Sequence, residues 1–391
     1  MKIEQRWRVL AALSLARVGM GYQFQSVAAT APLLSDSLGF DAAQIGWLVG
    51  LYLLPGIAFA LPGGMLGARF GDKRMVLIGL ALMMAGGLGF ALSGDIVEAS
   101  FARATMGVGG VVLTVLLVKM VTDWFAGKEL VLAMSILINT WPIGIGIALL
   151  TQGALAQSVS WPAAFVATAA MAALGMASVF FGYTPAPGAP VAQKVDLRAF
   201  ARQEWILLGA TSLPWMIYNA AYVLSVSFLP IYFVDSGLSI VSAGGLTAIN
   251  TILIIVSVQA GGLLVQRFGH ADGIVYCSLA GWALATIGMM TSSAPLPWII
   301  ASGLIGGLPA GVLVSLPGEV LRAESRSTGM GIFYTMYYTG VAVAPPLAGA
   351  IAVQTASSAA PIWMAIACAA TSAGAFSMVR WLQKSAAAQR R

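Results

Sequence analysis

Long runs of apolar residues, separated by short polar segments, recur from one end of the chain to the other. A helix needs about 20 residues to cross about 30 Å of hydrocarbon, and each run is close to or beyond this length. Twelve spans are predicted, at residues 9–35, 44–68, 75–93, 99–122, 130–151, 161–183, 205–233, 240–266, 273–292, 297–320, 328–353 and 361–382. Only 9% of the 391 residues are charged, against about 25% in ordinary soluble proteins. The sequence therefore predicts an all-α, polytopic protein whose surroundings are the lipid bilayer.

Lysine and arginine residues indicate the orientation of the chain, because basic residues accumulate in cytoplasmic segments. With the N-terminus inside, seventeen of the 20 basic residues lie in predicted cytoplasmic segments. The other three, Arg17, Arg103 and Lys119, fall within predicted spans. We therefore expect both termini in the cytoplasm and a location in a bacterial inner membrane. This topology accounts for the net charge of +6, so nucleic acid is not expected as a partner.

One stretch of twelve residues occurs twice in related form. GGMLGARFGDKR at 63–74 and GGLLVQRFGHAD at 261–272 share six residues at an offset of 198. The pair PLLSDSLG at 32–39 and PIYFVDSG at 230–237 has the same offset. A repeat of this kind, with an even number of spans in each copy, is typical of the parallel repeats of secondary transporters. The sequence therefore predicts a duplicated six-helix unit.

The boundary between the two units is predicted in a segment rich in proline and charge, residues 184–204. An N-terminal six-helix half then covers residues 1–183, and a C-terminal six-helix half covers residues 205–391. We expect the chain to function as a monomer.

The loop after the second span carries a recognisable pattern. Gly64, Arg69, Gly71, Lys73 and Arg74 match the signature Gly-x-x-x-Asp-Arg-x-Gly-Arg-Lys/Arg, while Ala68 and Asp72 depart from it. The fourth span contains Arg103-x-x-x-Gly107. In these motifs, in helix count and in internal repeat, the chain resembles the major facilitator superfamily. More faintly, it is similar to the cyanate and nitroimidazole transporter branch of that family.

The resemblance implies two six-helix halves that rock about a central site, with the first and seventh spans beside the cavity and no cofactor. It also implies that the signature loop helps to close the cytoplasmic side. The residues expected to take part in the conformational change are Gly64, Arg69, Gly71, Arg74 and Asp123 in the first half, and Gly262, Arg267, Gly269 and Glu319 in the second.

The strongest candidate for a binding residue is Arg17. It lies about eight residues into the first span, on the order of 12 Å deep at 1.5 Å per residue, too deep to reach the membrane surface easily. A charge at this depth indicates a functional site. Placing all 14 acidic residues leaves none at the middle of the predicted membrane. A guanidinium without a nearby carboxylate favours an anionic solute, which it can bind with two parallel hydrogen bonds.

Further candidates share helical faces with polar or aromatic neighbours. Substrate-binding side chains are predicted at Tyr22 and Gln25 in the first span, Trp215, Tyr218 and Asn219 in the seventh, and Tyr334, Tyr337 and Tyr338 in the eleventh. Tyr222 continues the stripe of the seventh span. Arg103, Asn139 and Asn250 are weaker candidates, and Lys119 is expected to pair with Asp123.

Several function classes find no support in the sequence. There is no Walker motif, no His-Glu-x-x-His and no Gly-x-Ser-x-Gly, so we do not expect an enzyme. Cys277 and Cys368 lie in separate spans, which predicts neither a disulfide nor a metal site. The leading hypothesis is a secondary transporter of a small anionic solute that works by exchange, by uniport or by carrying the proton on the solute. The alternatives are an exporter of neutral or hydrophobic compounds and a membrane receptor without transport activity.

Overall fold

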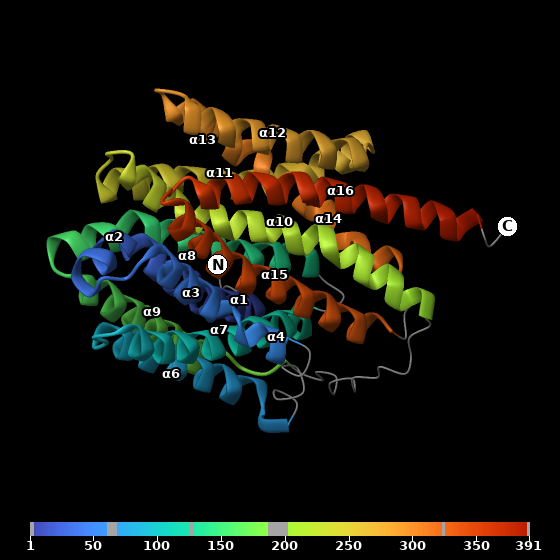
Figure 1. The fold of residues 1–391 in the computed structure, drawn as a ribbon. Coiled ribbons are helices and arrows are strands. Elements are labelled where there is room, and N and C mark those ends of the chain that lie inside the picture. The colour runs from blue at the N-terminus through green and yellow to red at the C-terminus, as the bar shows by residue number, and fades with distance from the viewer. Residues whose placement is uncertain (1–3, 61–68, 126–128, 187–201, 323–324, 389–391) are drawn as a thin grey trace.

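The computed structural model describes residues 4–60, 69–125, 129–186, 202–322 and 325–388, and these residues form helices and the turns between them (Figure 1). The first half contains α1 (Gln5–Phe24), α2 (Ser26–Leu38), α3 (Ala42–Leu53), α4 (Pro55–Phe59), α6 (Asp72–Ala91), α7 (Ile96–Phe125), α8 (Leu130–Ser158) and α9 (Trp161–Gly182). The second half contains α10 (Arg202–Asp235), α11 (Ile240–Phe268), α12 (Ala271–Thr291), α13 (Pro295–Gly306), α14 (Ala310–Ser315), the 3-10 turn η2 (Leu316–Glu319), α15 (Arg326–Thr355) and α16 (Ala360–Ala388).

Each predicted span corresponds to one of these helices or to a broken helix. Within the described part of the chain, 11 helical segments are long and apolar enough to cross a membrane. The remaining span, α1 with α2, is interrupted at Gln25. The predicted ends were less accurate: the fifth span, predicted to stop at residue 151, continues to Ser158, and α10 begins at Arg202, inside the predicted linker. The chain is a multi-pass membrane protein.

Three of the spans that were predicted as continuous helices are broken, so the prediction of continuity was wrong for them. Proline explains two of the breaks, because its ring removes a helical hydrogen bond and clashes with the preceding turn. Pro55 follows the end of α3, and Pro309 precedes α14. At Gln25 a side chain enters the helix: Arg103 donates hydrogen bonds to the carbonyl oxygens of Gln23 (3.0 Å) and Phe24 (2.6 Å), and a side chain inserted in this way interrupts the regular helical bonding.

Backbone conformation supports the internal repeat. The described glycines with positive φ form two pairs, each at the repeat offset: Gly39 with Gly237 (φ 69° and 95°), and Gly71 with Gly269 (φ 88° and 71°). Residues with a Cβ rarely adopt this conformation, so glycine at these turns is a steric requirement. The two copies of the repeated sequence thus both place a glycine with positive φ at the equivalent turn.

The two halves contact each other closely at the predicted external end, where α3 lies beside α15 and α8 beside α11 (Figure 1). A Cβ at Gly46 would lie 2.3 Å from the Pro345 carbonyl oxygen, and one at Gly50 would lie 2.2 Å from that of Ala342. A Cβ at Gly244 would lie 2.3 Å from the carbonyl oxygen of Leu149. Glycine therefore permits backbone contact between helices of opposite halves.

Candidate functional site

Arg17 is buried near the middle of the bundle. It lies twelve residues after the start of α1, about 18 Å along the helix axis, and only 9% of its surface is exposed. Its Nε and Nη1 atoms are buried and have no hydrogen-bond partner among the residues that the structure describes. An unpaired donor is costly inside a protein, and more so when it is charged. The structure thus leaves an arginine, which can bind an anion, with two unused donors.

The groups that interact electrostatically with Arg17 are the phenols of Tyr334, Tyr337 and Tyr338 on α15. Tyr338 is buried, and its phenol lies near the side chain of Thr114 on α7, which was not among the predicted binding residues. Tyr334 is 41% exposed and lies eight residues into α15, toward the predicted cytoplasmic end. The predicted tyrosines of the eleventh span therefore lie in the electrostatic neighbourhood of the arginine of the first span.

Aromatic side chains of α10 extend this group. The ring of Trp215 stacks on those of Tyr218 (5.8 Å between centroids), Tyr337 (6.3 Å) and Phe333 (6.3 Å). The Trp215 Nε1 and the Tyr222 hydroxyl are buried, and no described residue is their hydrogen-bond partner. We call the seven residues Arg17, Trp215, Tyr218, Tyr222, Tyr334, Tyr337 and Tyr338 the charge–aromatic cluster. It joins helices of both halves.

Other predicted binding residues are held by protein contacts. The Tyr22 hydroxyl is a partner of the Thr151 hydroxyl on α8, 3.2 Å away, and the Asn219 amide donates to the carbonyl of Trp215 in its own helix. The Gln25 amide donates to the carbonyl of Val226 on α10 at 2.7 Å, which links the two halves. Tyr218 donates to the carbonyl of Gly306. These polar groups mainly position helices around the charge–aromatic cluster.

The structure also shows what surrounds the weaker candidates for binding residues. Arg103 is fully buried, and in addition to its bonds at the α1–α2 break it donates to the carbonyl of Leu48 at 2.9 Å. Its guanidinium lies 4.5 Å from the centroid of the Tyr52 ring. Asn250 donates to the Ile299 carbonyl and the Ser302 hydroxyl, bridging α11 and α13. Asn139 is partly buried on α8. Arg103 and Asn250 thus use their donors on neighbouring helices.

The candidates for conformational change in the first half lie at the predicted cytoplasmic end. Gly64 is outside the described residues. Arg69 is exposed, with its guanidinium 5.3 Å from the Phe70 ring, and Arg74 is exposed at the start of α6. Asp123 accepts from Lys119 at 3.1 Å, the predicted pair, and Lys119 also binds Asp72 at 2.5 Å. The aspartate that departs from the family signature thus ties α6 to α7.

The equivalent residues of the second half form a related arrangement. Arg267 lies 5.7 Å from the ring of Phe268, as Arg69 does from Phe70. Glu319 accepts from Arg380 of α16 at 2.8 Å, and Arg380 also binds Asp272 at the start of α12. A Cβ at Gly262 would meet none of the described atoms within 4 Å, so this glycine does not permit a close helix contact. Gly261 makes that contact, 2.2 Å from the Leu308 carbonyl oxygen.

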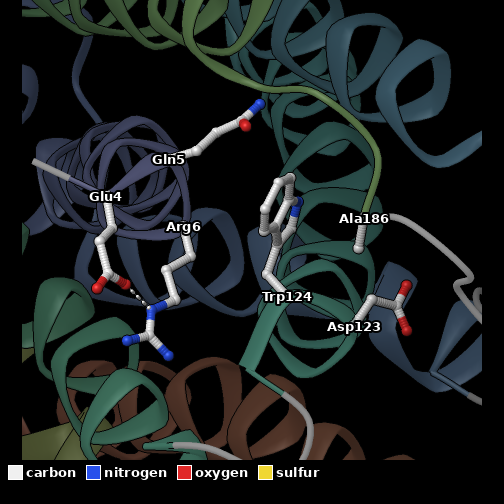
Figure 2. A pocket seen from close by; sticks show the side chains of 6 residues that line it. All are labelled: Glu4, Gln5, Arg6, Asp123, Trp124 and Ala186. Atoms are coloured by element: carbon white, nitrogen blue, oxygen red, sulfur yellow. Dashed lines mark ion pairs between the residues drawn. The ribbon is translucent and has the colours of Figure 1, made fainter.

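A separate cavity of about 360 Å³ lies at the predicted cytoplasmic end of the first half, where Figure 2 shows its lining side chains. The lining residues are Glu4, Gln5, Arg6, Asp123, Trp124 and Ala186. Arg6 binds both Glu4 at 2.7 Å and Glu129 at 2.8 Å, so its charge is already neutralised. Since none of the charge–aromatic cluster lines it, this cavity is distinct from the candidate site.

Similarity to known proteins was found at three levels. Residues 12–272 match the family model described as Major Facilitator Superfamily. The chain is 25% identical over 345 residues to the 3-(3-hydroxy-phenyl)propionate transporter of Escherichia coli, covering 84% of this chain and 83% of that protein. It is 24% identical over 248 residues to the hexuronate transporter of Bacillus subtilis, covering 60% of this chain and only 58% of that protein.

A third relative is the efflux pump dotC of Dothistroma septosporum, 29% identical over 208 residues, with 52% of this chain and 35% of the pump covered. Among solved structures, a bacterial homologue of the human lysosomal transporter Spinster, described as inward-facing and occupied, superimposes with a TM-score of 0.72. That match has 16% sequence identity and covers 98% of this chain and 97% of the other, so it shows the fold. From the family model and the helical arrangement together, the chain belongs to the major facilitator superfamily.

Proposed function

We propose that the protein is a secondary transporter of a small organic anion, with Arg17 as its main charge contact. The observation that carries the proposal is the pair of unpartnered, buried donors of Arg17. Arg103 provides the comparison within the same bundle, because its donors are used on carbonyl oxygens of neighbouring helices. An arginine that only held helices together would be expected to have its donors satisfied in the same way.

The names of two relatives support an organic anion, because hexuronate and 3-(3-hydroxy-phenyl)propionate are both carboxylates. Arg17 can bind a carboxylate through two donors, whereas a neutral solute would leave its charge without a counter-charge. The charge–aromatic cluster then forms the walls of the site, with Tyr334 on the side from which the solute enters or leaves.

Alternating access by rocking of the two halves accounts for the pattern of contacts between them. The close approaches at Gly46, Gly50 and Gly244 lie toward the predicted external end. The ion pairs of Lys119 and Arg380, at the predicted cytoplasmic end, each join helices of a single half. We therefore infer that this conformation is sealed toward the outside and corresponds to an inward-facing state, with both termini in the cytoplasm.

Transport into proteoliposomes tests the proposal. Radiolabelled benzoate and glucuronate are offered to the wild type, to Arg17→Gln and to Arg8→Gln. Arg8 lies on the same helix and is exposed, so its variant is the matched control. Loss of a charged hydrogen bond is expected to weaken binding by about ten- to a hundredfold in Arg17→Gln. Arg17→Gln transporting every anion as fast as the wild type would contradict the proposal.

A second candidate function, export of neutral or hydrophobic compounds, is favoured by the similarity to the efflux pump dotC. In that case Arg17 would hold helices together, and its charge would be dispensable for the solute. Growth of a strain lacking the protein in the presence of hydrophobic toxicants separates the two functions. Export predicts a sensitivity that Arg17→Gln corrects as well as the wild type does, whereas anion transport predicts no such sensitivity.

A further inference from the structure

Two buried polar atoms on α10 lack partners in the same way as Arg17. They are the Nε1 of Trp215 and the hydroxyl of Tyr222. Trp215 follows Arg17 by 198 residues, which is the offset of the internal repeat, so these residues occupy equivalent positions on α1 and α10. Unused donors therefore occur at one repeated position in both halves of the molecule. Arg17 supplies a charged pair of donors and Trp215 supplies a neutral one.

The side chain of Tyr337 connects these positions. Its phenol interacts electrostatically with both Arg17 and Tyr222. Its ring stacks on that of Trp215, with 28° between the planes. The ring of Phe333 also stacks on that of Trp215, with 17° between the planes. The charged end and the neutral end of the cluster are thus joined by flat aromatic surfaces that are roughly parallel.

The shape and chemistry of this arrangement restrict the solute. A small inorganic anion would use the donors of Arg17 and leave those of α10 unpaired. A flexible aliphatic carboxylate would gain little from parallel rings, which favour a planar partner that can stack. Buried polar atoms are normally satisfied, so a bound solute that supplies the missing partners would account for the unpaired atoms of α1 and α10.

We propose, on the basis of the transport function proposed above, that the solute is a planar aromatic carboxylate that carries a second oxygen on its ring. The carboxylate binds Arg17, the ring stacks within the aromatic side chains of α10 and α15, and the ring oxygen accepts from Trp215 Nε1 and Tyr222. Because Arg17 belongs to the first half and Trp215 to the second, such a solute contacts both halves at once. A carboxylate without the ring oxygen contacts the first half through its charge alone.

Equilibrium binding to the purified full-length protein tests this inference. The probes are benzoate and phenylacetate, each with and without a ring hydroxyl, together with cyclohexanecarboxylate and formate. In whichever pair, benzoate or phenylacetate, binds the wild type more tightly, the hydroxylated probe is expected to bind about five- to tenfold more tightly than the unsubstituted one. This difference is the gain from one good hydrogen bond. Benzoate is expected to bind more tightly than cyclohexanecarboxylate, which has similar size and the same charge but cannot stack.

Two variants test which side chains recognise the ring oxygen of the solute. Trp215→Phe keeps a flat ring and removes the N–H, and Tyr222→Phe removes only the hydroxyl. Each is expected to reduce the ratio between the affinities for the hydroxylated and the unsubstituted probe. Since Tyr222→Phe changes a single polar atom, it provides the result if Trp215→Phe fails to fold.

The outcomes separate this inference from the proposed function. Equal binding of benzoate and cyclohexanecarboxylate, or an unchanged preference in both variants, would overturn the aromatic two-ended site. If formate and cyclohexanecarboxylate still bind and require Arg17, the anion proposal survives that result. If none of the probes binds, or if Arg17→Gln binds all of them as the wild type does, the proposed function itself is overturned.

Discussion

The two buried arginines should respond in opposite ways to the same substitution. Arg103→Gln removes the donors that serve the carbonyl oxygens of Leu48, Gln23 and Phe24, and it also removes the contact of the guanidinium with Tyr52. Each acceptor left without a donor costs about 1–3 kcal/mol. The helix can recover part of this energy by closing the break at Gln25. We therefore expect a net loss of about 3 kcal/mol, of the size measured when one partner of a buried charged contact is removed.

Arg17→Gln removes a buried charge whose Nε and Nη1 have no partner, so the same change should leave stability unaltered or raise it. Thermal unfolding in detergent, followed by intrinsic fluorescence, compares the two variants with the wild type. At about 2–4 °C per kcal/mol for a large domain, Arg103→Gln should unfold roughly 6–12 °C lower, while Arg17→Gln should not. Equal destabilisation by both substitutions would refute the assignment of one arginine to the fold and the other to the solute.

Three further predictions follow from contacts described above. Gly50→Leu should prevent the packing of α3 on α15 and so open the external end. A cysteine introduced at the buried Val226, in a protein lacking Cys277 and Cys368, should then react with an impermeant maleimide from outside, whereas it should not react when Gly50 is intact. Unchanged labelling would contradict the external seal. Lys119→Met should cost about 1–2 kcal/mol by leaving Asp72 and Asp123 unpaired, and adding Asp72→Asn should restore part of the loss in a thermal-unfolding cycle. Gly71→Ala and Gly269→Ala should each cost about 1–2 kcal/mol because of the positive φ, and a Gly262→Ala control should change the midpoint by less than either.

Features that depend on hydropathy and on the repeat could be predicted from the sequence. Apolar length decides whether a segment spans the membrane, and so every predicted span has a helical counterpart. The offset between Gly71 and Gly269 predicted equivalent turns, and both adopt positive φ. The depth of Arg17 and the scarcity of acids predicted an unusual charge, and the structure places the tyrosines of the eleventh span beside it.

Features that depend on the direction of a side chain could not be predicted in this way. Arg103 and Arg17 look alike in the sequence, and only the structure shows that Arg103 donates to the carbonyl oxygens of Gln23 and Phe24. That break has no proline to indicate it, because it results from a residue distant in the chain. Similarly, Gly261 and Gly262 are neighbours on α11, and a rotation of about 100° around the helix decides which one meets Leu308.

The break at Gln25 connects the buried Arg103 with a contact between the two halves of the molecule. Arg103 donates to the carbonyl groups of Gln23 and Phe24 just before the break, and Gln25 itself extends from the bend to the Val226 carbonyl of the opposite half. Arg17 lies eight residues earlier on the same rigid helix. Any straightening of this bend would release the bridge to α10 and reorient the buried guanidinium in one movement. A local change in the geometry of a single helix can therefore link an event at the centre of the membrane to the opening of its outer face.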